Sequence, residues 1–87
     1  MKYKVGDTVK IKNFKEIEKM CHESIWNPDL LIPNDDKLNY GFNLEMKEYC
    51  GKKFKIRDNN FCFYLFEGIY NWKFEDWMIE EKRLELE

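Results

Sequence analysis

The stretch KKFKIRDNNFCFYLFEGIYNWK, residues 52–73, decides what kind of fold this chain adopts. Phe54 and Ile56 alternate with charged residues, and this period of two is typical of a half-buried strand. Two further apolar runs follow, FCFYLFE and IYNWK, and Asp58-Asn59-Asn60 and Glu67-Gly68 supply turn residues between the runs. The stretch therefore predicts three consecutive antiparallel strands joined by tight turns.

The middle strand leaves open which of its side chains face the core. One register places Phe61, Phe63 and Leu65 inside and leaves Tyr64 outside with its neighbours. The opposite register is equally allowed, because both faces of this strand are apolar. The pattern likewise leaves open whether Trp72, on the next strand, faces the core or the surface.

Upstream, the residues VGDTVKIK, positions 5–12, predict another strand, with Val9 and Ile11 on its buried face. NFKEIEKMC, positions 13–21, changes to helical spacing and predicts a short amphipathic helix with Asn13 as its N-cap. FNLEMKEYCG, positions 42–51, predicts a second short helix capped by Asn43, with Gly51 at the left-handed position beyond its end. FEDWM, positions 74–78, predicts a closing helical turn whose Trp77 and Met78 cover the core.

Residues 22–41 contain both prolines and several Asn and Asp turn signals, and predict an irregular inserted loop. Trp26, Leu30, Leu31 and Ile32 are the apolar residues expected to pin this loop to the body, with room for a short strand near Leu31.

Together these segments predict a mainly β chain with short helices, in which four to five antiparallel strands form a small barrel. Eighty-seven residues fit a single domain, here 1–80 with the insertion at about 22–41, followed by an acidic tail at 81–87. The terminal LELE resembles the remnant of a purification tag. No signal peptide or spanning run of about 18–20 apolar residues is seen, so we expect a cytoplasmic protein without a membrane partner.

The residues that carry chemistry favour binding over catalysis. Cys21, Cys50 and Cys62 are odd in number and widely spaced, which fits neither a disulfide framework nor a zinc site and indicates reduced packing thiols. The single histidine, His22, follows Cys21 directly, and adjacent helical side chains diverge by about 100°. We therefore expect no enzyme, no metal and no cofactor.

Three segments resemble a known group. VGDTVKIK, FNLEMKEYCGKKFKI and YNWKFEDWM, taken in this order, resemble small SH3-like barrel proteins of phages and prophages of low-GC Gram-positive bacteria, and more distantly the mind-bomb-type SH3-like repeats. The composition agrees with a low-GC source. Lys, Asn, Ile, Phe and Tyr, which have AT-rich codons, total 40 residues, whereas Gly, Ala, Arg and Pro, which have GC-rich codons, total 8. The resemblance implies an SH3-like fold and a phage-related origin, and it supplies no active site.

Two binding functions follow. The first is a module that binds a host protein and modulates an enzyme or defence system, as SH3-like barrels dock peptides on aromatic grooves. The alternative is a nucleic-acid-binding barrel with a basic and aromatic strand face, although the net charge of −2 disfavours it. The oligomeric state is left open. The residues predicted to contact a partner are Trp26, Tyr64, Tyr70, Trp72, Lys53, Lys55 and Arg57.

Overall fold

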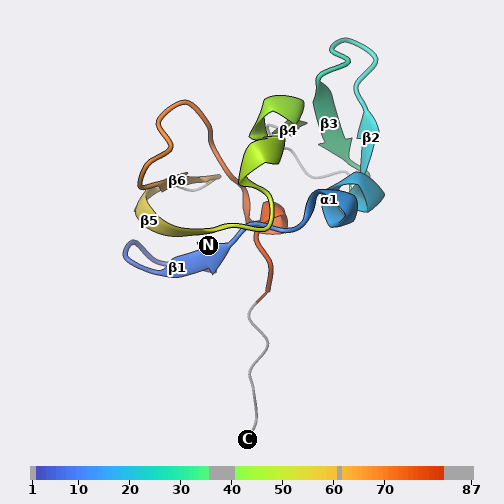
Figure 1. Ribbon diagram of the computed structural model, residues 1–87. Coiled ribbons are helices and arrows are strands. Elements are labelled where there is room, and N and C mark those ends of the chain that lie inside the picture. The colour runs from blue at the N-terminus through green and yellow to red at the C-terminus, as the bar shows by residue number, and fades with distance from the viewer. Residues whose placement is uncertain (1, 36–40, 61, 82–87) are drawn as a thin grey trace, which may run out of the picture.

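The computed structural model describes residues 2–35, 41–60 and 62–81, which form a mainly β structure with short helices (Figure 1). The predicted tail from residue 82 onward lies outside these residues. Phe61 lies outside them as well. The elements, in chain order, are β1 (Thr8–Lys10), α1 (Phe14–Met20), β2 (Cys21–Glu23), β3 (Leu30–Pro33), β4 (Phe42–Asn43), the 3-10 helix η1 (Leu44–Tyr49), β5 (Lys53–Asn59), β6 (Tyr64–Phe66) and the 3-10 helix η2 (Asp76–Met78).

The strands form two antiparallel three-stranded sheets, with orders β1-β5-β6 and β2-β3-β4. In Figure 1 the first sheet lies at the lower left and the β2–β3 hairpin rises at the upper right, with α1 below the hairpin and η1 between the two. The described strands do not close into one barrel. The mainly β class with short helices is therefore confirmed, and the barrel is not seen.

In the first sheet, β5 is the central strand. Val9 of β1 pairs with Phe54, and Ile56 of β5 pairs with Phe66 of β6. Val9 and Ile56 are buried as predicted, because alternate side chains of these strands face the core. An isolated bridge between Ile11 and Ile79 ties the residue after β1 to the residue after η2.

β6 adopts the second of the two registers that the sequence allowed. Tyr64 and Phe66 are fully buried, whereas Leu65 between them is partly exposed. The predicted third strand, IYNWK, is not formed. Residues 67–73 are a loop instead, and only Phe74 returns to β6, through a bridge to Tyr64.

The side chain of Arg57 explains how this loop is held. Its Nε donates to the carbonyl oxygen of Phe66 at 3.1 Å and its Nη2 to that of Ile69 at 3.5 Å. Arg57 thus occupies carbonyl oxygens that would accept backbone hydrogen bonds in a paired strand. The side chain of Ile69 is buried in the core. The apolar residues of IYNWK thus attach a loop to the core, and the periodicity of the sequence alone does not distinguish such a loop from a strand.

Residues 22–41 were expected to form an irregular loop, and this prediction was wrong for the described part. β2 and β3 form a regular hairpin in which His22 pairs with Ile32 and Glu23 with Leu31, and β4 pairs with β3 through Phe42. The strand expected near Leu31 is present. The two strands are only three and four residues long, so turn residues dominate the sequence and hide the alternation.

One core connects the two sheets. It contains buried side chains from both sheets and from the helices, namely Val9, Ile11, Ile17, Leu31, Phe42, Met46, Ile56, Tyr64, Phe66, Ile69, Phe74, Met78 and Ile79. Aromatic rings form its centre: the centroids of Phe66 and Phe74 lie 5.0 Å apart. Because each buried aromatic side chain removes about 150–250 Å² from water, few residues suffice for this core.

Both short helices and the closing turn form where the sequence predicts them. Asn43 caps η1, since its Oδ1 accepts a hydrogen bond from the backbone N–H of Glu45 at 2.9 Å. Asn13 precedes α1, but its side chain makes no cap hydrogen bond. In η2, Met78 is buried and Trp77 packs against the core while remaining partly exposed. None of the described helices has the length and apolar character to cross a membrane.

Candidate protein-interaction surface

The loop that joins β2 to β3 carries the two most exposed of the large apolar side chains described. Ile25 is 88% exposed and Trp26 is 89% exposed. The loop, residues 24–29, lies at the end of the hairpin that projects from the body at the upper right of Figure 1. We call residues 24–29 the hairpin tip. The prediction that Trp26 pins this segment to the body was therefore wrong.

Hydrogen bonds within the tip fix its shape. The hydroxyl of Ser24 accepts from the backbone N–H groups of Trp26 at 3.1 Å and Asn27 at 3.3 Å. The side-chain oxygen of Asn27 accepts from the N–H of Asp29 at 2.9 Å, and its carbonyl from the N–H of Leu30 at 3.1 Å. Ser and Asn side chains bonded to nearby backbone in this way stabilise turns. Trp26 is therefore displayed on an ordered turn.

Hydrogen bonds hold both ends of β3. The N–H of Leu44, the first residue of η1, donates to the carbonyl oxygen of Asp29 at 2.7 Å. The N–H of Asn34 donates to the carbonyl oxygen of Met20, the last residue of α1, also at 2.7 Å. One bond lies at the tip and the other at the base of the hairpin, so the tip has a defined direction relative to the core.

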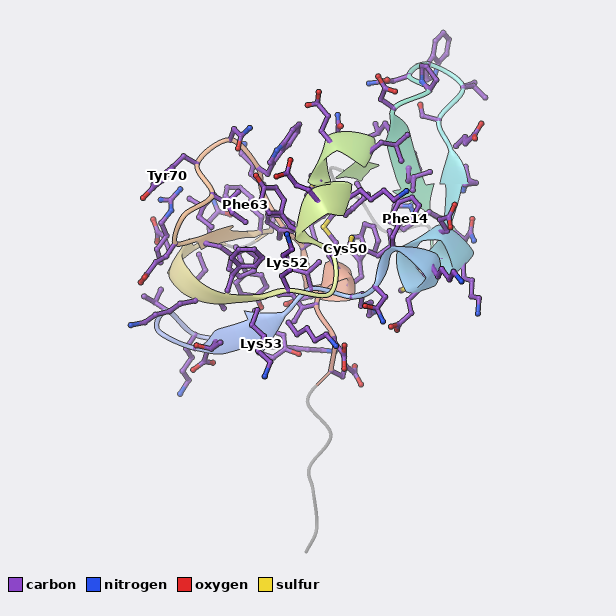
Figure 2. The ribbon with its side chains drawn as sticks, viewed as in Figure 1. Phe14, Cys50, Lys52, Lys53, Phe63 and Tyr70 are labelled. Atoms are coloured by element: carbon purple, nitrogen blue, oxygen red, sulfur yellow. The ribbon has the colours of Figure 1, made fainter. Side chains whose placement is uncertain are left out.

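A second aromatic surface lies on the first sheet. Tyr70 is 79% exposed, and the guanidinium carbon of Arg57 lies 5.0 Å from its ring centroid. The ammonium of Lys73 lies 4.9 Å from the ring of Phe63 in the same region. Figure 2 shows Tyr70 and Phe63 on the opposite side of η1 from the hairpin. Trp26 at the hairpin tip and the Tyr70–Arg57 pair thus lie on two separate surfaces.

Trp72 belongs to neither surface. It is half-buried, packs against the core and lines a shallow hollow of about 260 Å³ between the 71–73 segment and the β3–β4 region. The other lining residues are Leu30, Gly41, Asn43, Met46, Asn71 and Lys73. In this position Trp72 packs against the core, so a partner can contact only the exposed part of its ring.

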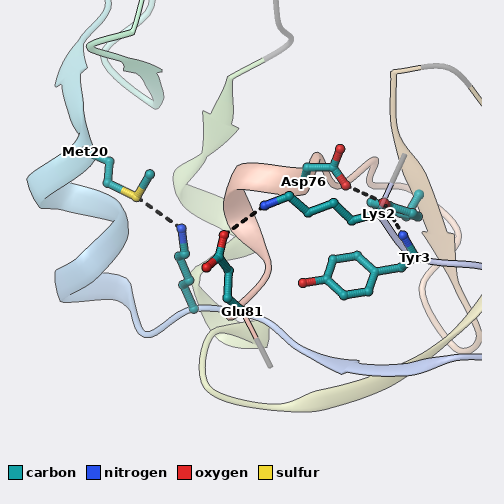
Figure 3. A network of polar contacts seen from close by, with 7 residues as sticks. Lys2, Tyr3, Met20, Asp76 and Glu81 are labelled. Atoms are coloured by element: carbon teal, nitrogen blue, oxygen red, sulfur yellow. Dashed lines mark hydrogen bonds and ion pairs between the residues drawn. The ribbon is translucent and has the colours of Figure 1, made fainter. Parts of the chain in front are cut away.

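Tyr64 was predicted as a contact residue, and the structure contradicts this. Its side chain is fully buried in the core. Its hydroxyl donates to Asp76 and accepts from the backbone N–H of Tyr3 at 3.1 Å. Figure 3 shows Asp76 and Tyr3 with the dashed lines of these two bonds. Burial and the hydrogen bond to Asp76 both raise the pKa of this phenol. Tyr64 therefore acts as a structural link.

The predicted cations lie on the outer face of β5, where Lys53 and Lys55 are exposed. A carboxylate lies beside these strands. The ammonium of Lys10, which pairs with Lys53, lies 3.4 Å from the carboxylate of Glu80. This carboxylate partly offsets the positive charge that a phosphate backbone requires.

Cys21 and His22, which are adjacent in the sequence, do not face each other. Cys21 and His22 are neighbours on β2, where successive side chains point to opposite faces. The Nδ1 of His22 lies 2.8 Å from the side-chain oxygen of Asn34. Burial raises the pKa of Cys21 to about 11 and also raises the pKa of Cys50. Within the described ranges, no group of three His, Cys, Asp or Glu residues is placed to hold a metal ion.

Comparison of the chain with protein-family models, with curated proteins and with solved structures finds no match. The geometry of the hairpin tip therefore carries the functional argument. The sequence did contain a signal for it. In Ser-Ile-Trp-Asn-Pro-Asp, residues 24–29, two large apolar residues stand inside a run of turn formers, and side chains in a tight turn point outward.

Proposed function

We propose that this chain is a non-enzymatic binding module that recognises another protein through its hairpin tip. The observation that supports this is the display of Ile25 and Trp26, each nearly nine-tenths exposed, on an ordered turn. Burying one tryptophan side chain removes about 150–250 Å² from water, which corresponds to roughly 4–6 kcal/mol at about 25 cal/mol per Å². Part of this free energy is lost to the cost of association.

The order of the tip increases the expected gain. A loop that must become ordered on binding loses conformational entropy, whereas a pre-ordered loop has already met that cost during folding. Tryptophan is also enriched among the few residues that dominate protein interfaces. In this proposal Trp26 is the anchor, and Ile25 extends the apolar contact beside it.

The proposal extends to origin and partner. A host protein as the partner, a phage or prophage origin and a cytoplasmic location are supported by the resemblance of three sequence segments and by the low-GC composition. Kinship with SH3-like barrels is supported by the antiparallel order β1-β5-β6 and by the 3-10 turn η2 that follows it. The hairpin is then the part specific to this chain.

Nucleic acid is the second candidate, and the stacking of Arg57 on Tyr70 is the observation that favours it. Exposed aromatic rings beside cations bind unpaired bases by stacking. Arg57, however, donates to two carbonyl oxygens of the 66–69 segment, and Glu80 is paired with Lys10 on the strand beside the lysines of β5. A groove for a phosphate backbone needs cations without such neighbours, so we favour the protein partner.

The test is capture of binding partners from a host lysate by three forms of the protein. These are the native chain, Trp26→Ala, and Tyr70→Ala as the matched control, because both variants remove one exposed aromatic ring. We expect the native chain and Tyr70→Ala to retain the same protein after nuclease treatment. Trp26→Ala is expected to weaken its binding at least 30-fold, as at a central interface residue.

The opposite pattern would refute the proposal. If the retained material is nucleic acid, if salt releases it steeply, and if Tyr70→Ala or Lys53→Ala/Lys55→Ala removes it, the basic face is the binding surface. Equal retention of the same protein by the native chain and Trp26→Ala excludes the tip as the anchor.

A further inference from the structure

Acidic residues flank the hairpin tip on both sides. Glu23 precedes the tip directly and Asp29 ends it, and both are exposed. The hairpin residues 21–35 contain three acidic residues and neither Lys nor Arg. The exposed indole is thus flanked in the chain by the carboxylates of Glu23 and Asp29, and these charges restrict the surfaces that can approach it.

The adjoining helix η1 extends this acidic region. The hydrogen bond from Leu44 to Asp29 brings the start of η1 against the tip, and Glu45 follows it. Residues 21–35 and 41–50 together carry five acids and one lysine, a net charge of −4 with His22 neutral, whereas residues 2–20 carry six lysines and three acids, a net charge of +3. The ammonium of the one lysine, Lys47, lies 4.4 Å from the ring centroid of Phe14.

We infer that the site receiving Trp26 is an apolar pocket ringed by lysines or arginines on another protein. This inference rests on the proposed function and adds the chemistry of the partner. A basic ring complements Glu23 and Asp29, speeds encounter and excludes partners of the wrong charge. The indole fills the pocket, and the carboxylates meet the cations at its rim.

The same charges disfavour the other surfaces that accept a tryptophan. Anionic lipid headgroups and nucleic acid phosphates repel a tip flanked by carboxylates. A second copy of this chain presents the same negative charge around its own tip, so two tips repel each other. A protein pocket with a basic rim is the surface that satisfies both the apolar anchor and its surroundings.

The experiment uses three β-cyclodextrins as defined pockets, since each has an apolar cavity that accommodates an indole ring. One has a neutral rim, one a rim of primary amines and one a rim of carboxylates. Each is titrated into the full chain while the indole N–H signal of Trp26 is followed by NMR. The signal is identified as the one missing from the spectrum of Trp26→Ala.

We expect the amine-rimmed cavity to bind Trp26 about three- to ten-fold more tightly than the neutral one at low salt, which is the effect of two exposed charge pairs. The carboxylate-rimmed cavity should bind more weakly than the neutral one. The preference should fall to within about two-fold near 0.5 M salt, where exposed charges are screened.

Two variants of equal net charge supply the control. Glu23→Gln/Asp29→Asn should remove the preference for the amine rim. Glu16→Gln/Glu18→Gln, which neutralises two exposed carboxylates on α1, should retain it. This pair separates a local effect at the tip from attraction to the net charge of the whole chain.

Equal binding of Trp26 to neutral and amine-rimmed cavities would overturn the inference and leave the proposed function intact. Binding of the tip to phosphatidylserine vesicles or to a thymidine oligonucleotide would also overturn it, as would a dimer that sediments only when Trp26 is present. The proposed function fails separately, if the captured protein binds Trp26→Ala as well as it binds the native chain.

Discussion

Tyr64 donates its phenolic hydrogen to the carboxylate of Asp76, and the same oxygen accepts from the backbone N–H of Tyr3 at 3.1 Å. One hydroxyl thus joins β6, the closing turn η2 and the segment that precedes β1 (Figure 3). Lys2 and Glu81 strengthen the same junction at the surface, where Nζ and the carboxylate lie 2.8 Å apart. These contacts hold the closing segment on the first sheet.

This junction predicts a loss of stability in alkali. Burial first, and the hydrogen bond to Asp76 second, raise the pKa of Tyr64 above its usual value of 10.0. The folded chain therefore keeps a proton that the unfolded chain releases, so stability is complete below pH 10 and decreases above it. Between pH 8 and pH 11, we expect urea unfolding of the native chain to lose about 1.4 kcal/mol more than that of Tyr64→Phe.

The comparison of slopes isolates Tyr64. Burial also raises the pKa values of Cys21, Cys50 and Tyr3, and these groups contribute the same alkaline loss to both proteins. Parallel pH profiles for the native chain and Tyr64→Phe would show that the phenol titrates normally. A lower stability of Tyr64→Phe at every pH does not affect this test, which depends on the change with pH alone.

Gly41 is predicted to be far less replaceable than Gly68. Both have positive φ angles, +78° and +86°, which cost a side chain about 1 kcal/mol. A Cβ atom at Gly41 would also lie 2.8 Å from the carbonyl oxygen of Leu31, whereas a Cβ atom at Gly68 would have no other heavy atom within 4 Å. We expect Gly41→Ala to lower the free energy of unfolding by about 2–4 kcal/mol and Gly68→Ala by about 1.

Chemical denaturation of the two variants measures this difference. Gly41 precedes β4, and the close contact with Leu31 lies where β4 pairs with β3. Equal losses for the two variants would mean that β3 and β4 separate enough to admit a methyl group. The pairing of these strands would then be looser than the distances indicate.

The sequence predicted those parts of the fold in which local pattern and burial agree. Val9 and Ile11 alternate with polar residues, so their inward direction was readable, and Asn43 before an apolar helical spacing marked the start of η1. β6 was not readable in this way, because Tyr64 and Leu65 are both large and apolar. The choice between its two registers depends on Phe74 and Asp76, which reach Tyr64 only after folding.

The candidate site was predicted in part. Trp26 was named as a contact residue, but it was also expected to pin the loop, and the sequence alone could not separate these roles. Pairing of β2 with β3 determines its position, because the hairpin places residues 24–29 at its end. Such pairing depends on contacts between separate segments, and strands of three or four residues give too few positions for alternation to reveal it.

The three thiols should differ in reactivity. Cys62 is exposed, whereas Cys21 and Cys50 are half-buried and burial raises their pKa values. The thiolate is the reactive form, and at pH 8 a thiol with a pKa of about 11 is ionised to roughly one part in a thousand. We expect iodoacetamide to label one site rapidly, and Cys62→Ser to abolish that fast phase. Fast labelling of Cys21 or Cys50 in the folded chain would contradict their burial.

The two tryptophans at positions 26 and 72 should differ in their effect on stability. Trp26 is 89% exposed at the hairpin tip, so Trp26→Ala should change the free energy of unfolding by no more than about 0.5 kcal/mol. Trp72 packs against the core, and Trp72→Ala should cost about 1.5–3 kcal/mol, less than a fully buried tryptophan because its ring is partly exposed. Urea denaturation followed by circular dichroism measures both. A loss for Trp26→Ala as large as that for Trp72→Ala would show that the tip supports the fold, and its exposure would no longer indicate a binding role.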